Sequence, residues 1–137
     1  MPAVTAHEAL IYLMVVTSAS DRDMTDVELK RIGEVVRTWP IFLDFDADRI
    51  VAVARDCQEM LQEDDGLEDV LSTARKALPP HVHDTAYAAA FEVAAVDLEM
   101  RMEEVRVMQL LRQHLNVDPL TAAAIERAAK VRHKMLT

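Results

Sequence analysis

Residues 5–18 read TAHEALIYLMVVTS and combine a helix start with an apolar run. Thr5 and Glu8 have the spacing of a capping box, in which each side chain accepts a hydrogen bond from the other residue's backbone amide. Apolar residues then follow at helical spacing as far as Thr17. The stretch therefore predicts a helix that starts at the capping box, ends near residues 18–20 and is buried along its apolar side.

The same signals recur along the chain and predict further helices. A second capping box lies at Thr25–Glu28, prolines follow Trp39 and Leu78, and Asp118-Pro119 has the form of an N-cap followed by proline. The segment 40–45 is expected to be a buried connector or helical turn. The expected helices cover residues 25–38, about 48–62 with a cap at Asp46 or Asp48, 67–78, 83–98, 102–115 and 119 onward.

These elements predict an all-α fold, a bundle of about seven helices that forms a single domain over residues 1–137. Residues 83–98 are alanine-rich and nearly apolar on all sides, so they are expected to form the central helix. The chain is 51% apolar and has one cysteine, which excludes a disordered chain, a disulfide framework and a Cys-built zinc site. Its two glycines are too few for a glycine-rich phosphate loop.

The charge of the chain is unevenly distributed. The net charge is −9; residues 1–100 hold 20 acidic and 8 basic residues, or −12, and residues 101–137 hold 4 and 7, or +3. Nucleic acid is therefore not an expected partner. The acidic part could bind cations, basic partners or a second copy of the chain, or it could be a solvated surface that aids solubility. Arg127, Lys130 and Lys134 share one face of the last helix and could meet an acidic lipid surface or the acidic part of a second copy.

An acidic helix–turn–helix segment recurs after a shift of 76 residues. Asp21 then matches Asp97, and Met24 matches Met100. The apolar positions that follow stay in step, which predicts an internally duplicated hairpin. The residues that share the pattern and supply carboxylates are Asp21, Asp23, Glu28, Asp97, Glu99 and Glu104.

These six carboxylates predict a weak divalent-cation site at the paired turns. Calcium and magnesium prefer carboxylate oxygens, and either ion is a candidate; no other cofactor is expected. The spacing is not that of an EF-hand, because Asp26 and Ile32 stand where that loop has glycine and glutamate. The alternative is that each acidic residue only caps its own helix or turn.

The first hairpin carries a recognisable motif, Ser20-Asp21-Arg22-Asp23-Met24-Thr25-Asp26-Val27-Glu28. Together with the apolar first helix and Trp39-Pro40, it resembles the tellurite-resistance TerB family and its TerB-like relatives over roughly residues 5–135. The family pattern is Ala-Asp-Gly-x-Met/Ile-x-x-x-Glu, so Arg22, and Leu98 in the second copy, replace a glycine.

The resemblance implies a non-enzymatic, all-helical cytoplasmic protein that acts in tellurite and general stress resistance. It also implies protein partners, other Ter proteins at the inner membrane among them, some of which bind calcium. The alternative function is a plain scaffold or oligomerisation domain without ion chemistry, and a homo-oligomer fits either reading. The apolar run of the first helix is preceded by Glu8 and by no Lys or Arg, so neither a signal peptide nor a membrane span is expected.

Other constellations are interpreted as structural. No His stands three residues after a Glu, which excludes a di-iron bundle site. His81 and His83, with Asp84, follow two prolines and are interpreted as an exposed turn that caps the fifth helix rather than a metal site. Cys57 lies on an apolar helix face and is interpreted as a buried core residue, so no catalytic residue is expected.

Overall fold

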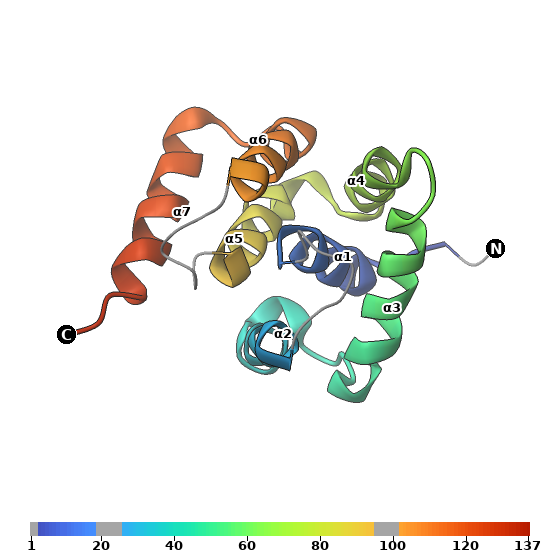
Figure 1. The fold of residues 1–137 in the computed structure, drawn as a ribbon, viewed down its shortest axis with the longest axis horizontal. Helices are drawn as coiled ribbons and strands as arrows, with labels where there is room; N and C mark the ends of the chain where they lie inside the picture. The colour runs from blue at the N-terminus through green and yellow to red at the C-terminus, as the bar shows by residue number, and fades with distance from the viewer. Residues whose placement is uncertain (1–2, 19–25, 95–101) are drawn as a thin grey trace.

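Helix α1 (Ala6–Ser18) runs through the middle of the molecule and is surrounded by other helices (Figure 1). The computed structural model describes residues 3–18, 26–94 and 102–137, and the side chains from residue 105 in the last of these ranges. Within these ranges the chain is all-α, with seven α-helices and no strand. The other helices are α2 (Asp26–Thr38), α3 (Ile50–Leu61), α4 (Gly66–Ala77), α5 (His83–Ala94), α6 (Met102–Leu115) and α7 (Pro119–Arg132).

The central position of α1 follows from its sequence. All nine residues from Ala9 to Thr17 are buried, because no charged side chain interrupts the run after Glu8. Helices α2 to α6 all contact α1, and α7 packs on the far side of α5 (Figure 1). Such a helix is buried on every side rather than along one stripe.

The predicted central helix, residues 83–98, proves to be the principal neighbour of α1 rather than the centre itself. In α5 the residues Ala86, Ala89 and Ala90 are buried, and their small side chains allow close packing against α1. Glu92 gives α5 a charged, partly exposed side chain in its second half, whereas α1 has no charged residue after Glu8. The four residues predicted at the end of this helix, 95–98, lie outside the described residues.

Three short 3₁₀ helices connect the α-helices: η1 (Pro40–Phe42), η2 (Ala47–Arg49) and η3 (Pro80–Val82). The first of these is the helical turn predicted for residues 40–45, and Phe42 is buried within it. Asp46 accepts a hydrogen bond from the backbone amide of Asp48 at 2.9 Å, so it caps the 3₁₀ turn that leads into α3.

Two of the predicted helix starts are confirmed, and Thr25 of the second predicted capping box lies outside the described residues. Thr5 donates its amide to Glu8 Oε1 at 2.9 Å, and the amide of Glu8 donates to Thr5 Oγ1 at 3.1 Å, which completes the capping box of α1. Asp118 accepts from the amide of Thr121 at 2.9 Å and caps α7. The local capping signals in the sequence therefore agree with the observed starts of the first and last helices.

The turn between α3 and α4 depends on Gly66. A Cβ atom added there would overlap the carbonyl oxygen of Met60 and lie 2.7 Å from the carbonyl oxygen of Leu61. Backbone atoms cannot move aside as a flexible side chain can. The acidic run that precedes this glycine therefore ends in a turn that only glycine fits, and α4 starts directly from it.

Candidate functional site

The C-terminal parts of α1 and α5 are joined by a buried hydrogen bond. The hydroxyl of Thr17 lies 3.1 Å from the carbonyl oxygen of Ala90, and within 3.2 Å of two carbonyl oxygens of its own helix. Thr17 is the one buried polar residue of the core among those described. The segments 19–25 and 95–101 therefore begin at helix ends that lie side by side (Figure 1).

Most of the predicted cation ligands lie outside the described residues. This holds for Asp21, Asp23, Asp97 and Glu99. Glu104 belongs to the first turn of α6, but its side chain also lies outside the described part.

Glu28 is the sixth of these residues, and it lies half-buried in the first turn of α2. Among the described residues no three His, Cys, Asp or Glu side chains are grouped so that they could hold a metal ion. The cation site and the duplicated turn therefore remain predictions.

Of the two histidines after Pro79-Pro80, His83 makes contacts that give it a structural role. The ring of His83 lies between two carbonyl oxygens, with Nε2 3.0 Å from Leu78 and Nδ1 3.3 Å from Leu115. These carbonyls belong to the C-terminal ends of α4 and α6. Because its ring nitrogens face backbone oxygens of two other helix ends, His83 links the start of α5 to the ends of α4 and α6.

Cys57 is buried, as the sequence predicted. Its thiol lies 3.7 Å from the carbonyl oxygen of Tyr12, and burial raises the pKa of the thiol to about 12. A thiol that remains protonated is a poor nucleophile. The position therefore has the properties of a small core residue.

Glu92 forms an anchor that sequence patterns did not reveal. It accepts hydrogen bonds from Arg132 and, at 2.8 Å, from Nε2 of His133. Partial burial raises the pKa of Glu92, but the two hydrogen bonds and the nearby positive charges outweigh burial and hold the pKa below its ordinary value. The signal in the sequence was an acid in the otherwise apolar stretch of α5 after its first turn, and a half-buried carboxylate there needs a cation from another element.

A groove of about 260 Å³ lies between α5, α6 and α7. Tyr87 and Met108 form its buried floor, and the Tyr87 hydroxyl donates to Glu126 Oε2 at 2.8 Å. Burial is the main reason that the pKa of Tyr87 is raised, and the bond to Glu126 adds to it. The tyrosine in this groove therefore stays protonated. Its bond to Glu126 joins α5 to α7, as the bonds of Glu92 also do.

No helix in the described part of the chain has the length and hydropathy that crossing a membrane requires.

Comparison with known protein families matches the chain to the family described as tellurite resistance protein TerB, over residues 7–128 of the 137 residues. No curated protein and no solved structure matches the chain. The matched residues run from the first turn of α1 into the second half of α7, so they include α2 to α6 in full and most of α1 and α7. The chain therefore belongs to the TerB family of tellurite resistance proteins.

Proposed function

We propose that this chain is a non-enzymatic helical interaction module of the tellurite and stress response, with a weak divalent-cation site at its two acidic turns. The family match over residues 7–128 is the observation that carries the proposal. The partners in this proposal are other Ter proteins at the inner membrane, and the chain itself works in the cytoplasm.

The absence of a role in catalysis is supported by the chemistry of the core. The thiol of Cys57 and the hydroxyl of Tyr87 are buried, and burial raises the pKa of both groups. Each is therefore held in its protonated, unreactive form at neutral pH. Two charged residues of the described part have structural roles, because Glu8 caps α1 and Glu92 anchors the end of α7.

The cation part of the proposal is supported by the contact between Thr17 and Ala90. This contact holds together the two helix ends from which the acidic segments 19–25 and 95–101 start. Two segments that start side by side can supply carboxylates to one ion, which calcium and magnesium both need from several oxygen ligands.

Calorimetric titration of the full chain with calcium and with magnesium tests the cation site. Wild type is expected to release or take up heat with a weak affinity, and Asp21→Asn or Asp97→Asn is expected to weaken binding about tenfold or more. Asp44→Asn is the matched control, because Asp44 is exposed, lies far along the chain from both turns and has a positive φ that asparagine tolerates.

If wild type gives no heat with either ion, the cation site is wrong and the scaffold alternative without ion chemistry remains. The interaction part is tested separately in cells. Deletion of the coding sequence is expected to lower tellurite resistance, and Asp21→Asn together with Asp97→Asn is expected to restore it less well than Asp44→Asn. Equal resistance with and without the chain would contradict the proposed role.

A further inference from the structure

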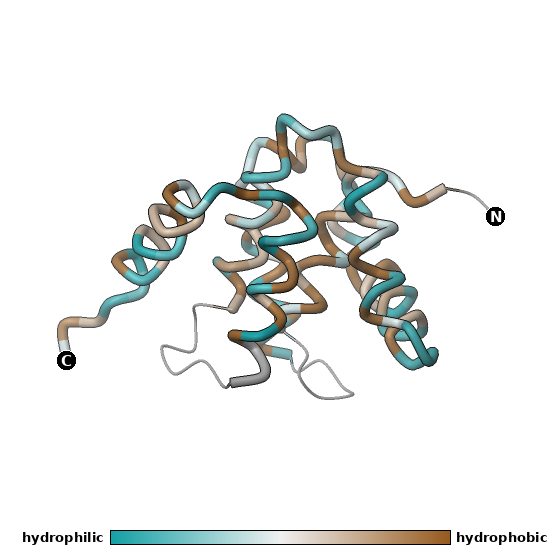
Figure 2. The backbone as a smooth tube through the Cα atoms, turned by 90° about the horizontal axis from the view of Figure 1, so that it is seen from above, coloured by the Kyte–Doolittle hydropathy of each residue, from teal (hydrophilic) through white to brown (hydrophobic). Residues whose placement is uncertain are grey.

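The outer face of α7 is unpartnered and apolar. The helix packs on α5 through Ala122 and Ala129, which are buried. On the opposite side Leu120 is 82% exposed and Val131 is 50% exposed. One side of this helix is therefore packed while the other leaves apolar side chains in water, and the helix lies at one edge of the molecule (Figures 1 and 2).

Exposed positive charge also lies on α7 and just after its end, where Lys130 borders the groove between α5, α6 and α7 and Lys134 follows the helix. Arg127, Lys130 and Lys134 are exposed, and none of them takes part in an ion pair found among the described residues. The other charged residues of the helix are occupied on its inner side, where Arg132 binds Glu92 and Glu126 binds Tyr87. We call the exposed set Leu120, Arg127, Lys130, Val131 and Lys134 the basic edge.

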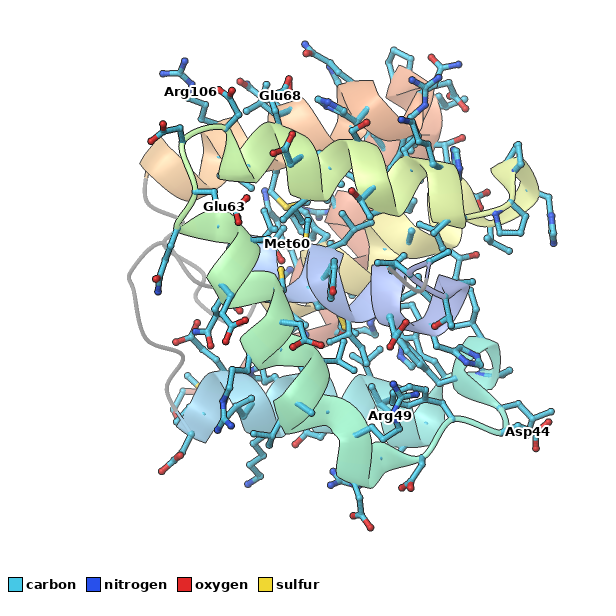
Figure 3. The ribbon with its side chains drawn as sticks, turned by 90° about the vertical axis from the view of Figure 1, so that its right-hand side faces the viewer. Asp44, Arg49, Met60, Glu63, Glu68 and Arg106 are labelled. Atoms are coloured by element: carbon cyan, nitrogen blue, oxygen red, sulfur yellow. The ribbon has the colours of Figure 1, made fainter. Side chains whose placement is uncertain are left out.

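The opposite edge of the molecule has the complementary character. Its surface is the outer side of α3, which lies at the other end of the longest axis from α7 (Figure 1) and faces the viewer in Figure 3. Val51 is 52% exposed there, and one exposed cation, Arg55, lies a turn further along α3. The exposed carboxylates of α3 and of the turn after it include Asp56, Glu59 and Glu63. We call this set, with Asp64 and Asp65, the acidic edge.

We propose that the basic edge of one copy of the chain binds the acidic edge of a second copy. Each edge supplies exposed apolar side chains as well as charges, with Leu120 and Val131 on one edge and Val51 on the other. The prevailing charges of the two edges are opposite in sign, which steers two copies together and sets their orientation. An anionic bilayer would match the basic edge alone, would leave the acidic edge without a partner and would repel a chain of net charge −9.

The geometry makes this association head-to-tail. Because the two edges lie at opposite ends of the molecule, a pair formed through them leaves one free edge on each copy. Such heterologous contacts add further copies and give open chains rather than a closed dimer. Each edge is a single helix face, so the contact is small, transient and sensitive to salt.

Neither edge includes the segments 19–25 and 95–101, so this inference does not depend on the proposed cation site. Sedimentation velocity of the full chain tests it. At about 20 mM NaCl the weight-average sedimentation coefficient is expected to rise with protein concentration, and at about 300 mM NaCl the association constant is expected to fall about tenfold.

Charge reversal on each edge identifies the surfaces. The triple variant Arg127→Glu/Lys130→Glu/Lys134→Glu is expected to weaken association at least about tenfold. The control, Lys30→Glu/Arg37→Glu/Lys76→Glu, makes the same change in net charge at exposed cations of α2 and α4 and is expected to weaken it less. The variant Asp56→Lys/Glu59→Lys/Glu63→Lys is expected to be monomeric alone. When it is mixed with the basic-edge variant, the opposite charges meet again and alternating chains are expected to form.

Three results would overturn the inference. Wild type could remain monomeric at low salt up to about 1 mM protein, or the two reversed variants could fail to associate when mixed. Circular dichroism of each variant separates such a failure from loss of folding. The third result is binding of monomeric wild type to vesicles of phosphatidylglycerol and phosphatidylcholine that the basic-edge variant loses, which would assign this edge to a bilayer instead.

Discussion

The hydroxyl of Thr17 in α1 donates to the carbonyl oxygen of Ala90 in α5 at 3.1 Å, in a part of the core that is otherwise apolar. Hydrogen bonds between side chain and backbone across two helices fix how far one helix can slide along the other. This bond therefore adds to the apolar packing that fixes α1 against α5 near the two helix ends that precede the acidic segments.

Replacing Thr17 with valine is expected to lower the free energy of unfolding by about 1 kcal/mol. Valine keeps the shape of the side chain but cannot donate to Ala90. The control is Thr38→Val, because the hydroxyl of Thr38 bonds only within its own exposed helix end, to the carbonyl oxygen of Glu34. Urea unfolding followed by circular dichroism measures both, and equal stability of the two variants would show that the bond between helices contributes nothing.

Much of the fold was predictable because its signals are local. The capping box of Thr5 and Glu8, the N-cap at Asp118 and the prolines at 40 and 79 set helix ends through neighbours in sequence. Physical chemistry at this range does not depend on the rest of the chain. The predicted sixth helix, residues 102–115, therefore agrees with α6 as observed.

Tertiary relationships were not predictable in the same way. Which of two apolar helices is central depends on the helices that surround them. Helix α1 is the central one, and its run of buried residues is uninterrupted whereas that of α5 is not. The bonds of Glu92 with residues 132 and 133 join segments that are 40 and 41 positions apart. Nothing in the local pattern around Glu92 indicates its partners. The cation site depends on residues outside the described ranges, so the prediction stands untested.

Replacing Glu92 with glutamine is expected to destabilise the protein at neutral pH and to have less effect in acid. The folded-state pKa of Glu92 lies below its ordinary value of 4.5, so the ionised form is stabilised by folding. This contribution is complete above the pKa of the unfolded chain, and it is lost as the pH falls through the lower pKa of the folded state.

The measurement is the difference in unfolding free energy between wild type and Glu92→Gln at about pH 7 and at about pH 3. Glu34→Gln serves as the control, because Glu34 is an exposed acid of α2 with no ion pair among those found in the described residues. A difference that is the same at both pH values would show that the charge of Glu92 is not what holds the end of α7.

The two glycines of the chain are expected to respond in opposite directions to alanine. Gly66→Ala places a methyl group against backbone atoms of Met60 and Leu61 and is expected to cost about 1–3 kcal/mol. Gly33 lies within α2, where its Cβ would meet only the end of the Arg37 side chain, 2.6 Å away and free to move into solvent. Gly33→Ala is therefore expected to stabilise the protein by about 0.5–1 kcal/mol, since alanine favours the helix. Thermal unfolding of both variants checks the signs, and a stabilised Gly66→Ala would contradict the close approach in the turn.

The single thiol is expected to report on opening of the core. Cys57 is buried against Tyr12, and burial raises the pKa of its thiol to about 12. In the native protein a reagent therefore cannot reach the sulfur, and the sulfur is not in its reactive thiolate form. Reaction with a disulfide reagent at neutral pH should therefore be slow in buffer and should accelerate with urea in proportion to the unfolded population. Thr17→Val, which loosens α1 against α5, should increase the rate in buffer about fivefold for each 1 kcal/mol of lost stability, whereas Thr38→Val should leave it nearly unchanged. Fast labelling of the native wild type would place this thiol at the surface and contradict the packing of α3 on α1.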